Sequence, residues 1–466
     1  MKKLKVGLLP FYVELYDIAC PEVRPDIDAA HENTIRRLRE QGLEVVTWPV
    51  CRLAAEFSAA IAHFEAEQVD AMVTLHLAYS PSLESEKALA ATELPIVILD
   101  TTPEYVYDQH TPDTAEMLNH GIHGVQDMCN LLIRNGKKFT VCAGHMDHSD
   151  VLERVVAAVR VARVAKNMRN ARVGLVGNVF AGMGDFRVDF AELKKDLGVE
   201  VVPYDWEKGG QCVSGITQTE IDAEYEKDSQ RFIIPESISR KVYDLSARTA
   251  LGIRKWVEQE QLTGFSINFM DSSSQRPGLP VMPFTECCTA MENGIGYAGE
   301  GDVLTAAFTG ALLSAYPETT FAEMFCPDWA HGAVFLSHMG EFNYAIAKDK
   351  PVMLEKDFPF TDAENPTAAY QTMKGGRAVF LNLAPFGNGR YSLILAPGQM
   401  LHVEGENNMN TMTNGWFKPD VQLERFLERF SQAGATHHGV LVYGDVLEEL
   451  IPLADRLGCK CVVIKE

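Results

Sequence analysis

The chain has 466 residues, which is too long for one compact core, so two or three domains are expected. Its 64 acidic residues outnumber 42 basic ones and give a formal net charge of -22, which argues against nucleic acid and anionic membrane as partners. No uncharged apolar run reaches the ~18 residues of a spanning helix, and the ten scattered cysteines contain no CxxC pair, so reduced thiols in a cytoplasm are expected.

The first two hundred residues alternate β-rich runs with amphipathic segments, which is typical of parallel sheets wrapped by helices. The opening run "KVGLLPF" (5–11) reads as a first strand and not as a signal peptide. The segment 28–42 predicts a helix with Asp28 and Gly42 at its ends. One doubly wound unit is expected to end near residue 136, and the strand "FTVCAGH" (139–145) is expected to begin a second. The further strands are predicted at "LEVVTWPV", "VDAMVTLH", "LPIVILD", "ARVGLVGN" and "VEVVPYD".

A glycine-bearing loop, "GLVGNVFAGMGDF" (174–186), follows one of these strands. Its glycines do not fall in the order G-x-G-x-x-G, and no acidic residue stands at the expected strand end about 20 residues further on. A nucleotide cofactor is therefore not favoured. The sequence also lacks a P-loop and a G-x-S-x-G nucleophile elbow.

Two carboxylates in the region 277–341 stand in unusual settings. Glu300 lies between Gly299 and Gly301, whose small size permits a close backbone approach, just before Asp302 in a helix N-cap position. Glu323 lies in the apolar run "TTFAEMF", and a buried acid needs a cation, a metal or a proton. Each has a second interpretation, because Glu300 could be a solvated loop carboxylate and Glu323 could face water at a sheet edge.

The stretch "FLSHMGEF" (335–342) reads as a strand in which Val334, Leu336 and His338 share one face. His338 is then either a core histidine with a partner or a ligand held for chemistry. Residues 350–415 change to strands punctuated by proline and glycine, which predicts a small antiparallel β domain. The tail returns to helix and strand and carries the pair His437-His438, which is ambiguous alone.

Together these carboxylates and imidazoles form a coherent set of oxygen and nitrogen ligands without a thiolate. Such a set favours an octahedral Mn²⁺- or Co²⁺-like ion over structural zinc. The spacings are wide, and no HExxH helix supports the site.

Several motifs in this order resemble the L-arabinose isomerase family, which is related in fold to L-fucose isomerase. They are "PGLPVM", "AMENGIGYAGEGDVLTAA", "TTFAEMF", "LSHMGE" and "THHG", with "HGIHGVQDMCNLL" and "GHMDHSDVLERV" upstream. The resemblance implies an α/β protein with two doubly wound, Rossmann-like parallel-sheet domains and a smaller C-terminal β-barrel-like domain. The domains are expected at residues 1–136, 137–325 and 326–466.

The resemblance also implies roles for particular residues. A divalent metal, manganese most often and otherwise Co²⁺ or Mg²⁺, would be held by Glu300, Glu323, His338 and His438, with His437 as the fallback for the last. Glu300 and Glu323 would be the acid/base pair. Sugar contacts would come from Leu15, Tyr16, His123 and Met282. Because His123 matches a histidine that a neighbouring subunit contributes, the resemblance implies a homo-oligomer (trimer, tetramer or hexamer) with shared active sites.

The implied activity is a metal-dependent aldose-ketose isomerisation through an ene-diol, of L-arabinose to L-ribulose or of D-galactose to D-tagatose. The segment "FYVELYDIA" (11–19) departs from the family's sugar-contacting run, of which only Leu15 and Tyr16 survive, and Gln126-Asp127 replaces an arginine-glutamate pair. Two alternatives therefore stay open. One is an isomerase of another sugar, such as L-fucose or a deoxy sugar, and the other is a sugar-binding protein without turnover.

Overall fold

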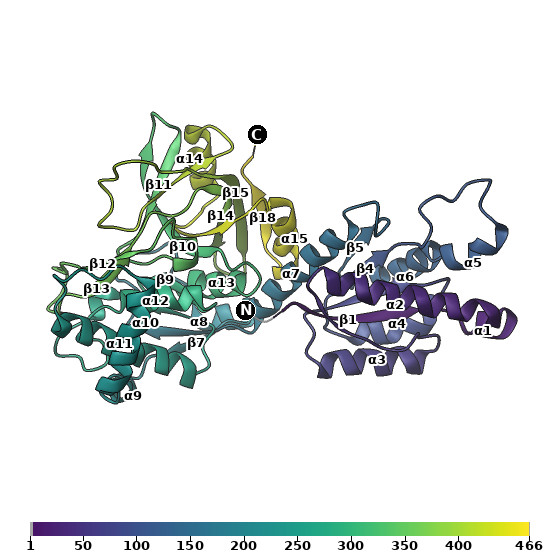
Figure 1. The fold of residues 1–466 in the computed structure, drawn as a ribbon, viewed down its shortest axis with the longest axis horizontal. Helices are drawn as coiled ribbons and strands as arrows, with labels where there is room; N and C mark the ends of the chain where they lie inside the picture. Colours follow the sequence, from purple (N-terminus) through teal and green to yellow (C-terminus); the bar gives the residue numbers. More distant parts are fainter. Residues whose placement is uncertain (1–2, 466) are drawn as a thin grey trace. The chain divides into compact units, whose positions relative to one another are not determined.

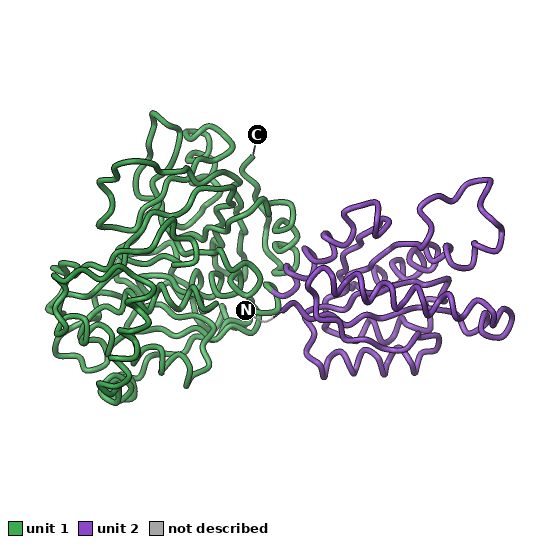
Figure 2. Tube along the Cα trace, viewed as in Figure 1, with its two compact units in different colours: residues 1, 164–466 green, residues 2–163 purple. Residues whose placement is uncertain are grey.

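The structure is a computed structural model that describes residues 3–465. The chain divides into two compact units, Lys2–Arg163 and Val164–Glu466 (Figure 2). Each is described by itself.

The N-terminal unit is built on a five-stranded parallel sheet with strand order β2-β1-β3-β4-β5 (Figure 1). Apolar side chains on its two faces form two separate cores. The strands are β1 (Lys5–Phe11), β2 (Glu44–Val46), β3 (Ala71–His76), β4 (Ile96–Asp100) and β5 (Phe139–Ala143). The helices are α1 (Glu14–Ala19), α2 (Arg24–Glu40), α3 (Ala54–Ala66), α4 (Ser82–Ala91), α5 (Glu116–Asn119), α6 (Ile122–Arg134) and α7 (Val151–Arg169), with 3₁₀ turns at Pro21–Val23 and Asp113–Ala115.

Two details of this unit differ from the sequence expectation. The strand β5, expected to open a second domain after residue 136, pairs with β4 from Ile96↔Phe139 to Asp100↔Ala143 and so belongs to the first sheet. The helix α2 begins at Arg24 and not at Asp28, because Pro25 near its N-terminus is already compatible with helical geometry. Gly42 follows the helix with φ +82°, as its position at the helix end predicts.

The second unit begins with a four-stranded parallel sheet of strand order β7-β6-β8-β9. Its strands are β6 (Arg172–Val176), β7 (Glu200–Pro203), β8 (Gly264–Ile267) and β9 (Gly296–Gly299). Its helices are α8 (Phe190–Leu197), α9 (Trp206–Ser214), α10 (Gln218–Arg231), α11 (Arg240–Gln259), α12 (Phe284–Glu292) and α13 (Val303–Leu313), with a 3₁₀ turn at Phe269–Asp271. Every residue of α13 is buried, because this helix packs on β8 and β9 and also on strands of the barrel that follows.

A closed barrel of six antiparallel strands completes this unit, in the order β14-β17-β10-β11-β16-β15, with β15 pairing back to β14. Figure 1 labels four of them, β10, β11, β14 and β15. The strands are β10 (Thr319–Asp328), β11 (Ala333–Ser337), β14 (Gly376–Pro385), β15 (Tyr391–Met400), β16 (Gly415–Pro419) and β17 (His438–Tyr443). The other elements are β12 (Val352–Glu355), β13 (Thr367–Tyr370), β18 (Lys460–Val463), α14 (Leu423–Gln432), α15 (Leu447–Leu457) and a 3₁₀ turn at Tyr344–Ile346.

The expected fold class is confirmed, with two parallel sheets followed by an antiparallel barrel. The boundary expected at residue 325 falls inside β10, whose whole length belongs to the barrel because it pairs with β11 and β17. Within residues 3–465, none of the helices combines the length and apolar character needed to cross a membrane.

Candidate metal centre

The barrel register brings Glu323 beside two histidines. Glu323 lies directly opposite His438 on β17 and directly opposite Ser337, the last residue of β11. Directly opposed side chains in an antiparallel pair have Cβ atoms about 4.5–5.5 Å apart. A bulge between Met324 and Cys326 interrupts the pairing just after Glu323, and bulges at such positions re-aim a side chain.

His338 is buried, but it does not continue the strand as the alternation of "FLSHMGEF" predicts. The strand β11 ends at Ser337, and the chain turns so that His338 Nδ1 lies 2.7 Å from Glu341 Oε2. The core-histidine interpretation is correct as to burial, since His338 is 3% exposed. Its partner is a carboxylate three residues later, which leaves Nε2 to face elsewhere.

Glu300 lies in the bend that follows β9, at the carboxyl end of the parallel sheet. Its φ of +64° is in the left-handed region, which is costly for a residue with a side chain and is found at functional sites. Two backbone hydrogen bonds fix this conformation, from Glu300 N to Ile267 O and from Phe180 N to Glu300 O. The flanking Gly299 permits the close approach that the sequence predicts, since a Cβ there would lie 2.6 Å from His338 Cε1.

These residues form two groups of potential metal ligands that share His438. One group is Glu300, His437 and His438, and the other is Glu323, His338 and His438, with ligand atoms in each group within 4.8 Å of one another. Glu300 Oε2 lies 3.3 Å from His438 Nε2 and 3.8 Å from His437 Nε2. The four residues implied as ligands by the resemblance are therefore divided between two groups that meet at His438.

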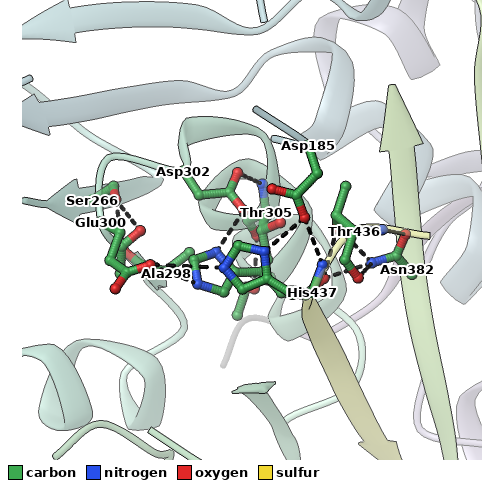
Figure 3. A network of polar contacts seen from close by, with 12 residues as sticks. Asp185, Ser266, Ala298, Glu300, Asp302, Thr305, Asn382, Thr436 and His437 are labelled. Carbon is green, nitrogen blue, oxygen red and sulfur yellow. Dashed lines mark hydrogen bonds and ion pairs between the residues drawn. The ribbon is translucent and has the colours of Figure 1, made fainter. Parts of the chain in front are cut away.

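Further carboxylates contact the Nδ1 atoms of the His437 and His438 imidazoles. In Figure 3 the polar contacts run from Glu300 through the imidazoles to Asp302 and Asp185. His438 Nδ1 lies 3.0 Å from Asp302 Oδ2, and His437 Nδ1 lies 2.6 Å from Asp185 Oδ2. The sequence reasoning missed Asp185, Glu341 and this role of Asp302. Only the predicted N-cap role of Asp302 is confirmed, because its side chain accepts a hydrogen bond from Thr305 N.

The charges at this centre favour an added positive charge. Burial alone would raise the pKa of Glu300, but the neighbouring imidazoles of His437 and His438 hold it well below its usual value. Burial alone would lower the pKa of His438, but Asp302 and Glu300 raise it to about 9. The carboxylates thus outweigh the desolvation that burial imposes on a protonated His438 imidazole.

Two phenylalanines fix the orientation of the His438 ring. Phe186, in the glycine-bearing loop after β6, stacks on it at 4.9 Å with an interplanar angle of 7°. Phe321 on β10 meets it edge-on at 4.9 Å and meets His338 edge-on at 4.8 Å. The glycine-bearing loop after β6 therefore supplies one wall of this centre through Phe186.

The residues implied as sugar contacts lie in different surroundings. In the N-terminal unit Leu15 is 60% exposed, and the Tyr16 hydroxyl lies 2.9 Å from His120 Nε2. His123 is exposed, with its ring 4.8 Å from that of Tyr79. In the second unit Met282 is buried, with 1% of its surface exposed.

The donor set fits a divalent metal ion. It offers carboxylate oxygens and imidazole nitrogens without a thiolate, the combination that suits manganese and similar ions. The buried His438 Nε2 makes no hydrogen bond of good geometry within the part of the chain that the structure describes. A buried imidazole nitrogen that faces a carboxylate but makes no hydrogen bond of good geometry is a fitting position for a metal ligand.

The chain matches two family models. Residues 160–315 match the L-arabinose isomerase central domain, and residues 318–460 match the L-arabinose isomerase C-terminal domain. The chain belongs to the L-arabinose isomerase family. Its membership makes it an isomerase, and the family's two matched domains contain every residue of the candidate metal centre.

Curated relatives match over most of the chain. The L-arabinose isomerase of Aeromonas salmonicida (strain A449) is 24% identical and covers 100% of this chain and 95% of its own. Those of Bacillus subtilis (strain 168) and Thermotoga maritima are each 24% identical and cover 84% and 91% of this chain and 80% and 86% of their own. A periplasmic solute-binding protein from Actinobacillus succinogenes 130z, solved with D-allose, has 13% identity, covers 67% of this chain and 91% of its own, and has a TM-score of 0.18, which is too low to carry an argument.

Proposed function

We propose that this protein is a divalent-metal-dependent aldose-ketose isomerase that converts L-arabinose to L-ribulose through an ene-diol. The observation that supports this most is the convergence of four side chains: Glu300 from a strained bend, Glu323 from within β10, His338 from the turn after β11 and His438 from the start of β17. The substrate is proposed from the relatives, each of which is an L-arabinose isomerase. Activity on D-galactose is the further expectation.

In this proposal Glu300, Glu323, His338 and His438 hold the metal, with manganese as the proposed ion. When bound, such an ion would act as a Lewis acid and stabilise the negative charge that develops on two neighbouring sugar oxygens. Phe186 and Phe321 keep the His438 ring from turning away and restrict water around it.

Glu300 and Glu323 are also the proposed acid/base pair. The reaction moves a proton between C1 and C2 of the sugar, so a carboxylate must take the proton from one carbon and deliver it to the other. The strained bend fixes Glu300, and the paired strand β10 fixes Glu323. Rigid placement of both groups supports proton transfer because catalytic geometry tolerates little error.

We also propose that the protein is a homo-oligomer in which His123 of one subunit contributes to the sugar site of another. Leu15 and Tyr16, from the segment that departs from the family's pattern, would take part in sugar discrimination. Light scattering coupled to size exclusion tests the assembly, and a monomer with full activity would contradict shared sites.

The test of the function is an aldose panel assayed for ketose formation with and without added Mn²⁺. We expect L-ribulose from L-arabinose only when the metal is present. Glu300→Gln and Glu323→Gln should each lower kcat by at least ~100-fold, the contribution of a general acid or base. The matched control is Glu318→Gln, because Glu318 pairs with Lys374 on the surface and belongs to neither ligand group. Turnover by Glu300→Gln equal to that of the unmodified protein would overturn the assignment.

A further inference from the structure

Two buried carboxylates, Glu341 and Asp302, contact the Nδ1 atoms of His338 and His438, the two imidazoles in the ligand group of Glu323. Glu341 is 2% exposed, and its Oε2 accepts from His338 Nδ1 at 2.7 Å and from Gly340 N at 2.8 Å. Its Oε1 accepts from the Tyr297 hydroxyl at 2.9 Å. Asp302 is 0% exposed, and its two oxygens are divided between His438 Nδ1 at 3.0 Å and Thr305 N at 2.9 Å.

These contacts determine which ring nitrogen of each histidine is available. A carboxylate accepts hydrogen bonds, so Nδ1 of His338 and of His438 must carry a proton. An imidazole that loses its other proton to bind a metal ion then has its lone pair on Nε2. His438 Nε2 is 3.3 Å from Glu300, and His338 Nε2 lies against Gly299, which is too small to block it. Both lone pairs are thereby directed at the candidate centre.

We propose that Glu341 and Asp302 are positioning residues that fix His338 and His438 as Nε2 ligands of the metal ion. This inference rests on the proposed function and deepens it, since it makes the affinity of the centre for the metal ion depend on two residues that would not contact the ion. Removing such a partner from a ligating histidine typically costs 10–100-fold in metal affinity.

The two carboxylates should respond differently to amide substitution. In Glu341→Gln one amide oxygen can replace Oε2 and accept from both His338 and Gly340, while the amide NH₂ donates to the Tyr297 hydroxyl. In Asp302→Asn a single oxygen must serve either His438 or Thr305, because the two donors now occupy separate oxygens. An amide NH₂ facing Nδ1 would favour the His438 tautomer protonated on Nε2, which cannot bind a metal ion.

The experiment measures Mn²⁺ affinity of the full chain by titration followed by electron paramagnetic resonance, in which free aqueous Mn²⁺ gives the signal. Circular dichroism and thermal unfolding check that each variant is folded. Two controls are matched to the test variants. Tyr297→Phe removes one hydrogen bond from Glu341 but leaves its contact with His338. Asp228→Asn alters a buried carboxylate that is bonded to Tyr243 and belongs to neither ligand group.

We expect Glu341→Gln to weaken Mn²⁺ binding by ~10-fold and Asp302→Asn by ~100-fold, the two ends of the range for lost partners of ligating histidines. Tyr297→Phe and Asp228→Asn should change the Mn²⁺ dissociation constant less than ~3-fold. Folded variants that bind Mn²⁺ as tightly as the unmodified protein would overturn the inference while leaving the proposed function intact. Absence of stoichiometric Mn²⁺ binding by the unmodified protein would instead overturn the proposed function.

Discussion

Replacing Gly299 by alanine should damage the candidate centre through a single added methyl group. The φ of Gly299 lies outside the left-handed region, so alanine is compatible with the backbone there. Its Cβ would lie 2.6 Å from His338 Cε1 and 3.0 Å from Nε2. Carbon atoms in contact sit about 3.5–4.0 Å apart, so the imidazole would have to retreat by ~1 Å.

The size of the effect follows from this displacement. Overpacking in a well-packed core costs about 1–3 kcal/mol of unfolding free energy. A ~1 Å misplacement at a catalytic centre can cost ~100-fold in rate. We therefore expect Gly299→Ala to be folded, to lose ~1–3 kcal/mol in urea denaturation, and to lose ~100-fold in kcat/KM for L-arabinose.

The matched control is Gly7→Ala in the N-terminal sheet, where a Cβ would lie 2.4 Å from the Phe64 ring, far along the chain from any candidate ligand. It should lose stability in the same range but keep its Mn²⁺ affinity. If Gly299→Ala binds Mn²⁺ and turns over sugar as well as Gly7→Ala does, the steric contact with His338 is unimportant and the prediction is wrong.

Three further predictions concern packing, metal and pH. Phe186→Ala removes a 2%-exposed phenyl ring that stacks on His438. We expect it to lower the unfolding free energy in urea by ~3 kcal/mol and to weaken Mn²⁺ binding. A loss of stability with unchanged Mn²⁺ binding would show that Phe186 does not orient the His438 imidazole. Mn²⁺ at 100 times its dissociation constant should stabilise the folded protein by about 2.7 kcal/mol and so raise its Tm. Treatment with EDTA should reverse this rise in Tm, and a His438→Ala variant should show no rise. Burial raises the pKa of Asp228 from 3.8 to about 6, so the folded state keeps this proton to higher pH than the unfolded state does. The unfolding free energy should therefore fall by up to ~3 kcal/mol as pH rises from 4 to above 6. The difference in unfolding free energy between the unmodified protein and Asp228→Asn should show this dependence on pH. A difference that does not vary with pH would refute the prediction.

Local pattern drew attention to the two carboxylates of the candidate centre, and the resemblance to the L-arabinose isomerase family supplied the full set of ligands. Glu300 between two glycines and Glu323 in an apolar run both conflict with their neighbours, and such conflicts indicate functional sites. The supporting carboxylates could not be predicted in the same way. Asp302 satisfies an ordinary N-cap pattern, and only the barrel strand β17, distant in sequence, reveals its second oxygen as the partner of His438.

The strands were easier to locate than to assign to sheets. The hydrophobic pattern of β5 is the same whether it ends one parallel sheet or begins another, and only its pairing with β4 decides. The pattern of "FLSHMGEF" likewise extends past the end of β11. His338 makes a hydrogen bond with Glu341 in the turn after β11 and does not continue the strand. The alternation of apolar and polar residues in a strand cannot predict such a hydrogen bond.

The position of β17 in the barrel has a consequence for how the protein folds. This strand is inserted between β10 and β14 although it follows both in the chain. One edge of β10 pairs with the neighbouring β11, but its other edge has no partner until β17 is added. Such non-local pairing is slow because loop-closure entropy is lost before contacts form. Glu323 and His438 meet only when this last barrel strand is seated. Acquisition of Mn²⁺ affinity during refolding should therefore report closure of the barrel, later than the parallel sheets and their helices.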